Sequence, residues 1–214
     1  MGFYDRHILP RFINCACGAP PIMKQREKLV PNAHGTVLEI GIGTGLNLPY
    51  YDPNKVEKLI GLDPSEESWT LAAERAEHLP FEVEFIGLPG EKIPLDDNSV
   101  DTVLVTFSLC TIPDPVMALR GMARVLRPGG RLLFCEHGKA PDASVLTWQN
   151  RVNPIWRIIF GGCNLNRDIP ALLEEANFTV ADLESMYLPS TPRFAGFNYW
   201  GTAMQGSPAS AAAT

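Results

Sequence analysis

The sequence has little of three features that would each place a protein in a distinct class. Basic residues are in the minority, with 18 Lys and Arg against 24 Asp and Glu and a net charge of −6, whereas nucleic-acid binding needs a basic face. The five cysteines include no Cys-x-x-Cys pair, so we predict no metal site. The longest apolar run, residues 102–112, is too short to cross a bilayer. We therefore expect a soluble, cytoplasmic protein with no integral membrane segment and no nucleic-acid partner.

The composition is that of an ordinary globular domain, with 45% apolar and 20% charged residues. The length predicts a single domain, which we place at residues 1–205. Residues 206–214 have no large side chain to bury, and we predict that they form a disordered tail.

Residues 36–135 alternate short apolar runs with amphipathic stretches, which is the pattern of an α/β domain with a parallel sheet. The predicted strands are 36–40, 58–62, 83–86, 102–106 and 131–135. Residues 66–78 and 115–126 have helical periodicity, and the second helix is expected to end in a turn at Arg127–Gly130.

The segments on either side of this core are predicted to be helical covers. Residues 3–30 would form an N-terminal lid, and residues 142–166 would cover the acceptor side; simple outer-layer helices are the alternative. A helix at 169–176 and strands at 178–187 and 197–203 would complete the sheet. The basic and apolar residues of the N-terminal helix would permit weak contact with a membrane surface, although we expect a lid.

A glycine-rich turn follows the first predicted strand. Gly41, Gly43 and Gly45 stand at alternate positions, where the missing Cβ atoms allow a sharp bend and close approach to a ligand. Asp63 follows the second strand, 22 residues after Gly41. A carboxylate at the tip of the neighbouring strand can accept hydrogen bonds from the two hydroxyls of a ribose. The pattern therefore predicts a nucleoside-containing ligand.

Glu39 decides between two such ligands. The dinucleotide fingerprint is G-x-G-x-x-G, but the spacing here is G-x-G-x-G, and Glu39 precedes it. A carboxylate would repel a pyrophosphate, whereas it can anchor the ammonium group of S-adenosylmethionine. We therefore favour this methyl donor over NAD.

An ordered set of motifs resembles the class I S-adenosylmethionine-dependent methyltransferases. The motifs are Glu39-x-Gly41-x-Gly43-x-Gly45, Asp63, Gly90-Glu91-x-Ile93-Pro94, Asp97-x-Ser99-Val100-Asp101 and Arg124–Gly130. The resemblance covers about residues 36–135. It implies a Rossmann-like fold, with a mostly parallel sheet flanked by helices, and S-adenosylmethionine as cofactor with S-adenosylhomocysteine as product.

The same resemblance implies the cofactor contacts, which run along the sheet edge from the methionine end to the adenine. Expected at the methionine part and the sulfonium are Tyr4, Glu39, Gly41, Ile42, Gly43, Gly45, Asn47, Thr106 and Phe107. Expected at the ribose and adenine are Asp63, Pro64, Gly90 and Glu91.

The C-terminal third is similar to the alkyl-thiol methyltransferases of animals and their soluble bacterial relatives. The similar segments are Leu109-Cys110-Thr111, Glu136-His137, Trp148-Gln149, Pro154-x-Trp156 and Gly162-Cys163-Asn164-Leu165-x-Arg167. The chain departs from the animal proteins at Pro192-Arg193, where they have Pro-His. Those proteins carry an N-terminal membrane anchor, which we do not expect here.

Four residues are candidates for an acceptor pocket, namely Leu109, His137, Trp148 and Trp156. His137 is also the candidate general base, and a structural histidine is the alternative. Pro154 is expected to interrupt the helix that would place Trp148 and Trp156 on one face.

We therefore expect methyl transfer from S-adenosylmethionine to a small, largely apolar acceptor, with a thiol as the first choice. A quinol, a phenol or a phospholipid headgroup is the alternative acceptor. Two other classes stay open from the residues alone: a nicotinamide oxidoreductase, and a non-catalytic protein that binds S-adenosylmethionine.

Overall fold

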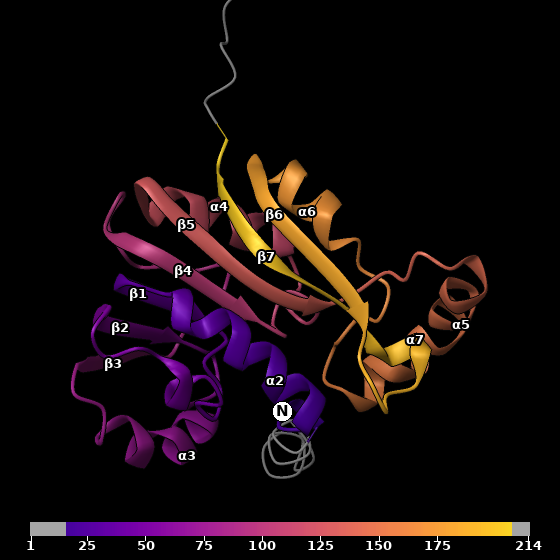
Figure 1. The fold of residues 1–214 in the computed structure, drawn as a ribbon, viewed down its shortest axis with the longest axis horizontal. Coiled ribbons are helices and arrows are strands. Elements are labelled where there is room, and N and C mark those ends of the chain that lie inside the picture. The colour runs from indigo at the N-terminus through magenta and orange to yellow at the C-terminus, as the bar shows by residue number, and fades with distance from the viewer. Residues whose placement is uncertain (1–15, 207–214) are drawn as a thin grey trace, which may run out of the picture.

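The computed structural model describes residues 16–206. Its centre is a seven-stranded sheet with the strand order β3-β2-β1-β4-β5-β7-β6 (Figure 1). The strands are β1 (Gly35–Ile40), β2 (Val56–Leu62), β3 (Glu82–Ile86), β4 (Val100–Thr106), β5 (Leu126–His137), β6 (Phe178–Tyr187) and β7 (Phe197–Gln205). The pairs from β3 to β5 are parallel, and β7 is antiparallel to both β5 and β6. The predicted α/β fold with a mostly parallel sheet is confirmed.

Helices cover both faces of the sheet. They are α2 (Pro20–Leu29), α3 (Glu66–Ala76), α4 (Pro115–Val125), α5 (Ala143–Ile159), α6 (Ile169–Glu175) and α7 (Arg193–Gly196). In Figure 1, α2 lies in front of the sheet, whereas α4 and α6 lie behind it. The side chains of Ser65 and Asp114 accept from backbone N–H groups in the first turns of α3 and α4, which fixes where these helices begin.

Consecutive strand residues are buried on opposite sides of the sheet, because side chains alternate along a strand. Leu38 and Val103 pack in one cluster with residues of α4 and α6. Leu104 and Val37 pack in the other with residues of α2 and α3. Continuous apolar runs are therefore required in the central strands, as in other sheets covered on both faces.

Two details of the predicted elements are wrong. Helix α4 ends at Val125, but Arg127–Gly130 belongs to β5 rather than to a turn. The pairing with β4 jumps from Leu126 to Arg131, so these four residues form a bulge that the positive φ of Gly129 (83°) allows. Pro154 lies inside α5 and does not interrupt it.

The two predicted covers differ in how they meet the sheet. Helix α2 packs across the sheet against β5 and β7 and buries Gln25 and Arg26; residues 3–15 of the predicted lid lie outside the described residues. Helix α5 projects beyond the end of the sheet (Figure 1) and buries only Gln149. Within residues 16–206, no helix is long and apolar enough to span a bilayer.

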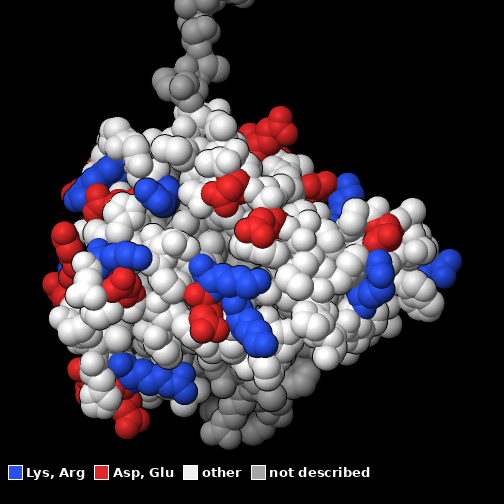
Figure 2. All heavy atoms as spheres, in the orientation of Figure 1, with Lys and Arg blue, Asp and Glu red and all other residues white. Residues whose placement is uncertain are grey.

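Positive and negative side chains are interspersed on the face shown in Figure 2, where no continuous basic stripe is visible. The charge pattern on this face agrees with the net charge of −6.

Leu104→Ala is expected to lower the free energy of unfolding by about 2–5 kcal/mol, because it leaves a cavity in the centre of β4. Leu104 is fully buried, whereas Leu71 on α3 is 50% exposed. Leu71→Ala is therefore the matched control and should change stability by less than about 1 kcal/mol. Urea unfolding followed by circular dichroism measures both, and equal losses would contradict the proposed core.

Candidate functional site

A cavity of about 620 Å³ opens at the carboxyl ends of β1, β2 and β4. This is the edge where the chain order reverses from β1 to β4, the usual ligand position in open parallel sheets. The cavity wall includes most of the predicted cofactor residues: Gly41, Ile42, Gly43, Asp63, Pro64, Gly90, Glu91, Thr106 and Phe107. The local motifs therefore converge on one site.

The glycine turn after β1 requires left-handed backbone conformations. The φ angles of Gly41, Gly43 and Gly45 are 74°, 50° and 72°, which residues with a Cβ rarely adopt. Gly41 and Gly43 line the cavity, but Gly45 does not. A Cβ on Gly45 would lie 2.6 Å from Leu48 Cδ1, so this glycine serves close packing rather than the cavity.

Asp63 is held rigidly at the end of β2. Its Oδ2 accepts from the backbone N–H of Gly43 at 3.0 Å, and its Oδ1 accepts from that of Ser65 at 2.8 Å. Burial raises the pKa of Asp63, and these two backbone hydrogen bonds partly offset that rise. Each carboxylate oxygen keeps a lone pair for a ligand hydroxyl, which fits the predicted contact with a ribose.

Glu39 and Asn47 lie behind the cavity wall, not on it. The Glu39 carboxylate accepts from Asn47 Nδ2 at 2.9 Å and from the Tyr51 hydroxyl at 2.6 Å. Burial raises the pKa of Glu39 to about 7, against the lowering effect of Tyr51, Asn47 and Arg26. Neither residue lines the cavity, although both were predicted to contact the ligand. We therefore assign both to support of the glycine turn.

Arg26 is the principal wall residue that the sequence analysis missed. It comes from α2 and is only 4% exposed. One terminal nitrogen of its guanidinium donates to Asn47 Oδ1 at 2.8 Å and to Thr106 Oγ1 at 2.6 Å. Both acceptors are neutral, and the buried Nε has no hydrogen-bond partner among the described residues. A buried cation with an unused donor is suited to an anionic ligand group.

The loop after β4 forms the opposite wall, and Glu136 holds it in place. The Glu136 carboxylate accepts from the backbone N–H groups of Ser108 and Leu109 at 2.6 and 2.9 Å and of Cys110 at 3.3 Å. Burial raises the pKa of Glu136 to about 7, and these hydrogen bonds oppose the rise. The loop begins at Phe107, whose φ of 52° is left-handed and costs strain for a residue with a Cβ.

The third strand supplies the adenine end of the predicted site. Gly90 lines the cavity, and a Cβ there would lie 2.9 Å from Ile112 Cδ1. Glu91 is also a wall residue, and its Oε1 accepts from the backbone N–H of Asp114 at 3.2 Å. Both residues line the cavity, and their contact with the adenine stays a prediction.

The predicted acceptor residues are not gathered around the cavity. Leu109 is fully buried in the core, and Trp148 is 58% exposed on α5, so neither is placed to contact an acceptor there. Trp156 stacks on Phe160 with ring centroids 3.8 Å apart. Tyr4 lies outside the described residues. These residues are far in sequence from the strands that form the cavity, so spacing alone could not predict whether they reach it.

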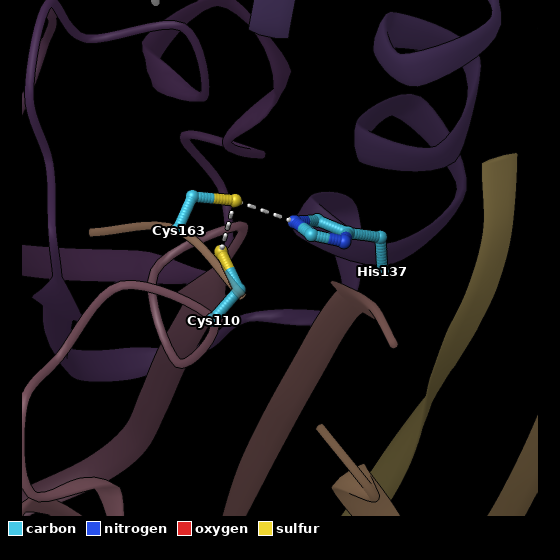
Figure 3. Close-up of side chains that lie close together, drawn as sticks. All are labelled: Cys110, His137 and Cys163. Atoms are coloured by element: carbon cyan, nitrogen blue, oxygen red, sulfur yellow. Dashed lines mark hydrogen bonds between the residues drawn. The ribbon is translucent and has the colours of Figure 1, made fainter. Parts of the chain in front are cut away.

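His137 is engaged with cysteines instead of facing the cavity. Its Nε2 lies 3.1 Å from Cys163 Sγ, which lies 3.7 Å from Cys110 Sγ (Figure 3). Trp156 Nε1 donates to the same Cys163 sulfur at 3.4 Å. Burial acts to lower the pKa of His137, but the charge and hydrogen bond of Cys163 outweigh it, and the pKa is raised. This contact argues against His137 as a free general base.

Residues 38–134 match a family model described as a methyltransferase domain. Thiol S-methyltransferase TMT1B of Rattus norvegicus is 36% identical over 169 residues, which are 75% of this chain and 69% of that protein. TMT1B of Homo sapiens is 36% identical over 190 residues, which are 81% of this chain and 77% of that protein.

The fold has counterparts among solved structures. An SAM-dependent methyltransferase from Thermotoga maritima superposes with a TM-score of 0.65 and 20% identity, covering 94% of this chain and 99% of that chain. At this identity the likeness concerns the fold.

Stability is expected to fall as the pH rises from about 4.5 to about 7. The pKa of Glu39 is raised from 4.5 to about 7 on folding, so its stabilising effect is complete below the unfolded value and is lost as the pH passes the folded one. The loss from this group is on the order of 3 kcal/mol. Glu39→Gln should make the profile of unfolding free energy against pH less steep.

The matched control is Glu74→Gln, on the exposed face of α3. It should leave the profile unchanged, while Glu136 keeps part of the slope in both variants because its pKa is also raised to about 7. An identical slope in wild type and Glu39→Gln would show that Glu39 is not the buried titrating group.

Proposed function

This chain belongs to the S-adenosylmethionine-dependent methyltransferases, and from that membership we propose that it methylates a small, largely apolar thiol. The observation that carries the thiol is the 36% identity with thiol S-methyltransferases, extended over 69–77% of their length. That span reaches beyond the cofactor core at residues 38–134.

The cavity fits the cofactor. Asp63 offers carboxylate lone pairs for the ribose hydroxyls, Gly41 and Gly43 leave room for close approach, and the unused Nε of Arg26 offers a charged donor for the methionine carboxylate. Pro64 and Gly90 would border the adenine. When bound, S-adenosylmethionine supplies a methyl group on a positively charged sulfur.

The cavity wall suits an acceptor that needs no general base. Apolar side chains form a large part of it, including Ile40, Ile42, Leu62, Phe107 and Ile112, and the described wall residues include no histidine. A thiol sulfur is a strong nucleophile and needs little help from a base, whereas a phenol oxygen needs more. An apolar wall excludes water from the sulfur nucleophile, and orientation then supplies much of the rate.

The test is methyl transfer from labelled S-adenosylmethionine to a small alkyl thiol, a catechol, a demethylated quinol and phosphatidylethanolamine. We expect turnover of the thiol, at a rate that rises with pH as the thiolate forms. Turnover of another class alone would overturn the thiol assignment and keep the methyltransferase. Binding of S-adenosylhomocysteine without any turnover would favour a non-catalytic binding protein.

Arg26→Met is expected to weaken S-adenosylhomocysteine binding by about 10- to 100-fold, the value of a hydrogen bond to a charged group. Binding of 5′-methylthioadenosine should change little, because this compound lacks the amino-acid carboxylate. Calorimetric titration measures both ligands. Arg120→Met, an exposed arginine on α4, is the matched control. Equal losses for the two ligands would mean that Arg26 only supports the fold.

A further inference from the structure

We propose that Cys110, His137 and Cys163 form a binding site for a soft divalent metal ion of the zinc type. The three residues come from separate segments: the loop after β4, the last residue of β5 and the loop after α5. Their ligand atoms all lie within 4.8 Å of one another. Figure 3 shows the two sulfur atoms and the imidazole nitrogen facing a common point.

The distances agree with tetrahedral coordination. Zinc–sulfur bonds of about 2.3 Å at a tetrahedral angle place two sulfur atoms roughly 3.8 Å apart, and Cys110 Sγ and Cys163 Sγ are 3.7 Å apart. The corresponding nitrogen–sulfur separation is roughly 3.5 Å, against 3.1 Å between His137 Nε2 and Cys163 Sγ. Two of the three separations are therefore within a few tenths of an ångström of the tetrahedral values. The third, between His137 Nε2 and Cys110 Sγ, is at most 4.8 Å, and metal binding would draw these two atoms together.

The three side chains can supply the negative charge that a divalent cation requires. Cys163 Sγ is in hydrogen-bond contact with both His137 Nε2 and Cys110 Sγ. Metal binding would release the proton of Cys110 and the Nε2 proton of His137, and two thiolates with a neutral imidazole would then balance the charge of a divalent ion. Glu136 and Arg167 are also near enough to interact electrostatically with the cluster, and their charges are of opposite sign.

The backbone around the cluster is already fixed. The carbonyl oxygen of Cys110 accepts from Asn164 N and from Asn164 Nδ2, both at 2.9 Å, so the two cysteine loops are joined. The N–H of Cys110 donates to Glu136, and Trp156 orients the sulfur of Cys163. A preorganised set of three ligands binds a metal without a large ordering cost.

The described residues provide three ligands and leave a fourth position for a small molecule, which is the pattern of open zinc sites. None of the three ligand residues lines the cavity, but Thr111, which follows Cys110, and Gly161, two positions before Cys163, do, so the cluster borders this part of the wall. The fourth ligand we infer is the thiolate of the acceptor. This last step rests on the proposed function, whereas the metal site does not.

The test is a cobalt(II) titration of the reduced, chelator-treated full chain, without S-adenosylmethionine. We expect one equivalent to bind, with thiolate-to-cobalt charge-transfer bands and the intense visible bands of a tetrahedral ion. Cys110→Ser, Cys163→Ser and His137→Gln should each weaken binding by more than about 10-fold, a loss that even outer ligands can cause. Cys135→Ser, a buried cysteine outside the cluster, is the control and should bind normally.

A second measurement uses the native chain, so it decides the question even if the variants fail to fold. In the native chain, zinc should protect Cys163, which is only partly buried, from alkylation and leave the partly buried Cys17 unprotected, as read by mass spectrometry. Absence of cobalt bands in the folded native protein would overturn the metal site. So would a cluster that only forms a Cys110–Cys163 disulfide under oxidant and binds no metal when reduced.

The acceptor step has its own readout. Addition of a small alkyl thiol should shift the cobalt charge-transfer bands, because a third sulfur enters the coordination shell. Unchanged bands would overturn the open fourth position and leave the metal site standing. The methyl-transfer panel fails or succeeds separately, so loss of the proposed function would be distinguished from loss of the metal site.

Discussion

The fold of the site depends on burying the Arg26 guanidinium beside the Glu39 carboxyl group without a direct ion pair between them. Asn47 lies between the two, accepting from the guanidinium at 2.8 Å and donating to the carboxylate at 2.9 Å, while Thr106 accepts from both Arg26 and Asn47. An unpaired buried charge is expensive, so every member of this network must keep its position. The network joins α2 to the ends of β1 and β4, and those ends are where the glycine turn and Phe107 shape the cavity.

A second buried carboxylate repeats this arrangement on the other side of the cavity. Glu136 gathers the three N–H groups that follow Phe107, in the way a bound anion would. The pKa values of both carboxyls are raised to about 7 by burial. Both carboxyl groups therefore change charge near neutral pH. Both hold loops in position by hydrogen bonds and neither lines the cavity.

The sequence was informative where chemistry and local backbone coincide. The strands and the positions of Gly41, Asp63 and Gly90 follow from periodicity and from turns, which are properties of a few neighbouring residues. The sequence was uninformative where distant segments meet. Nothing in the spacing of Cys110, His137 and Cys163 indicates that they touch, and Arg26 stands in an unremarkable helical stretch. Trp148 was misplaced because a tryptophan on an amphipathic helix resembles a pocket residue until the orientation of α5 is known.

The contribution of α2 to the cavity affects where the functional unit begins and ends. The conserved-domain match spans residues 38–134, yet Arg26 precedes it, and both His137 and Cys163 follow it. A fragment trimmed to the matched range would cut residues 35–37 from β1 and residues 135–137 from β5. It would also lose β7, which pairs with β5, and β6, which pairs with β7. It would thus expose an unpaired strand edge, a known route to aggregation. The boundaries of any expressed fragment of this protein should therefore follow its strand pairing and hydrogen bonds rather than the range of its sequence motifs.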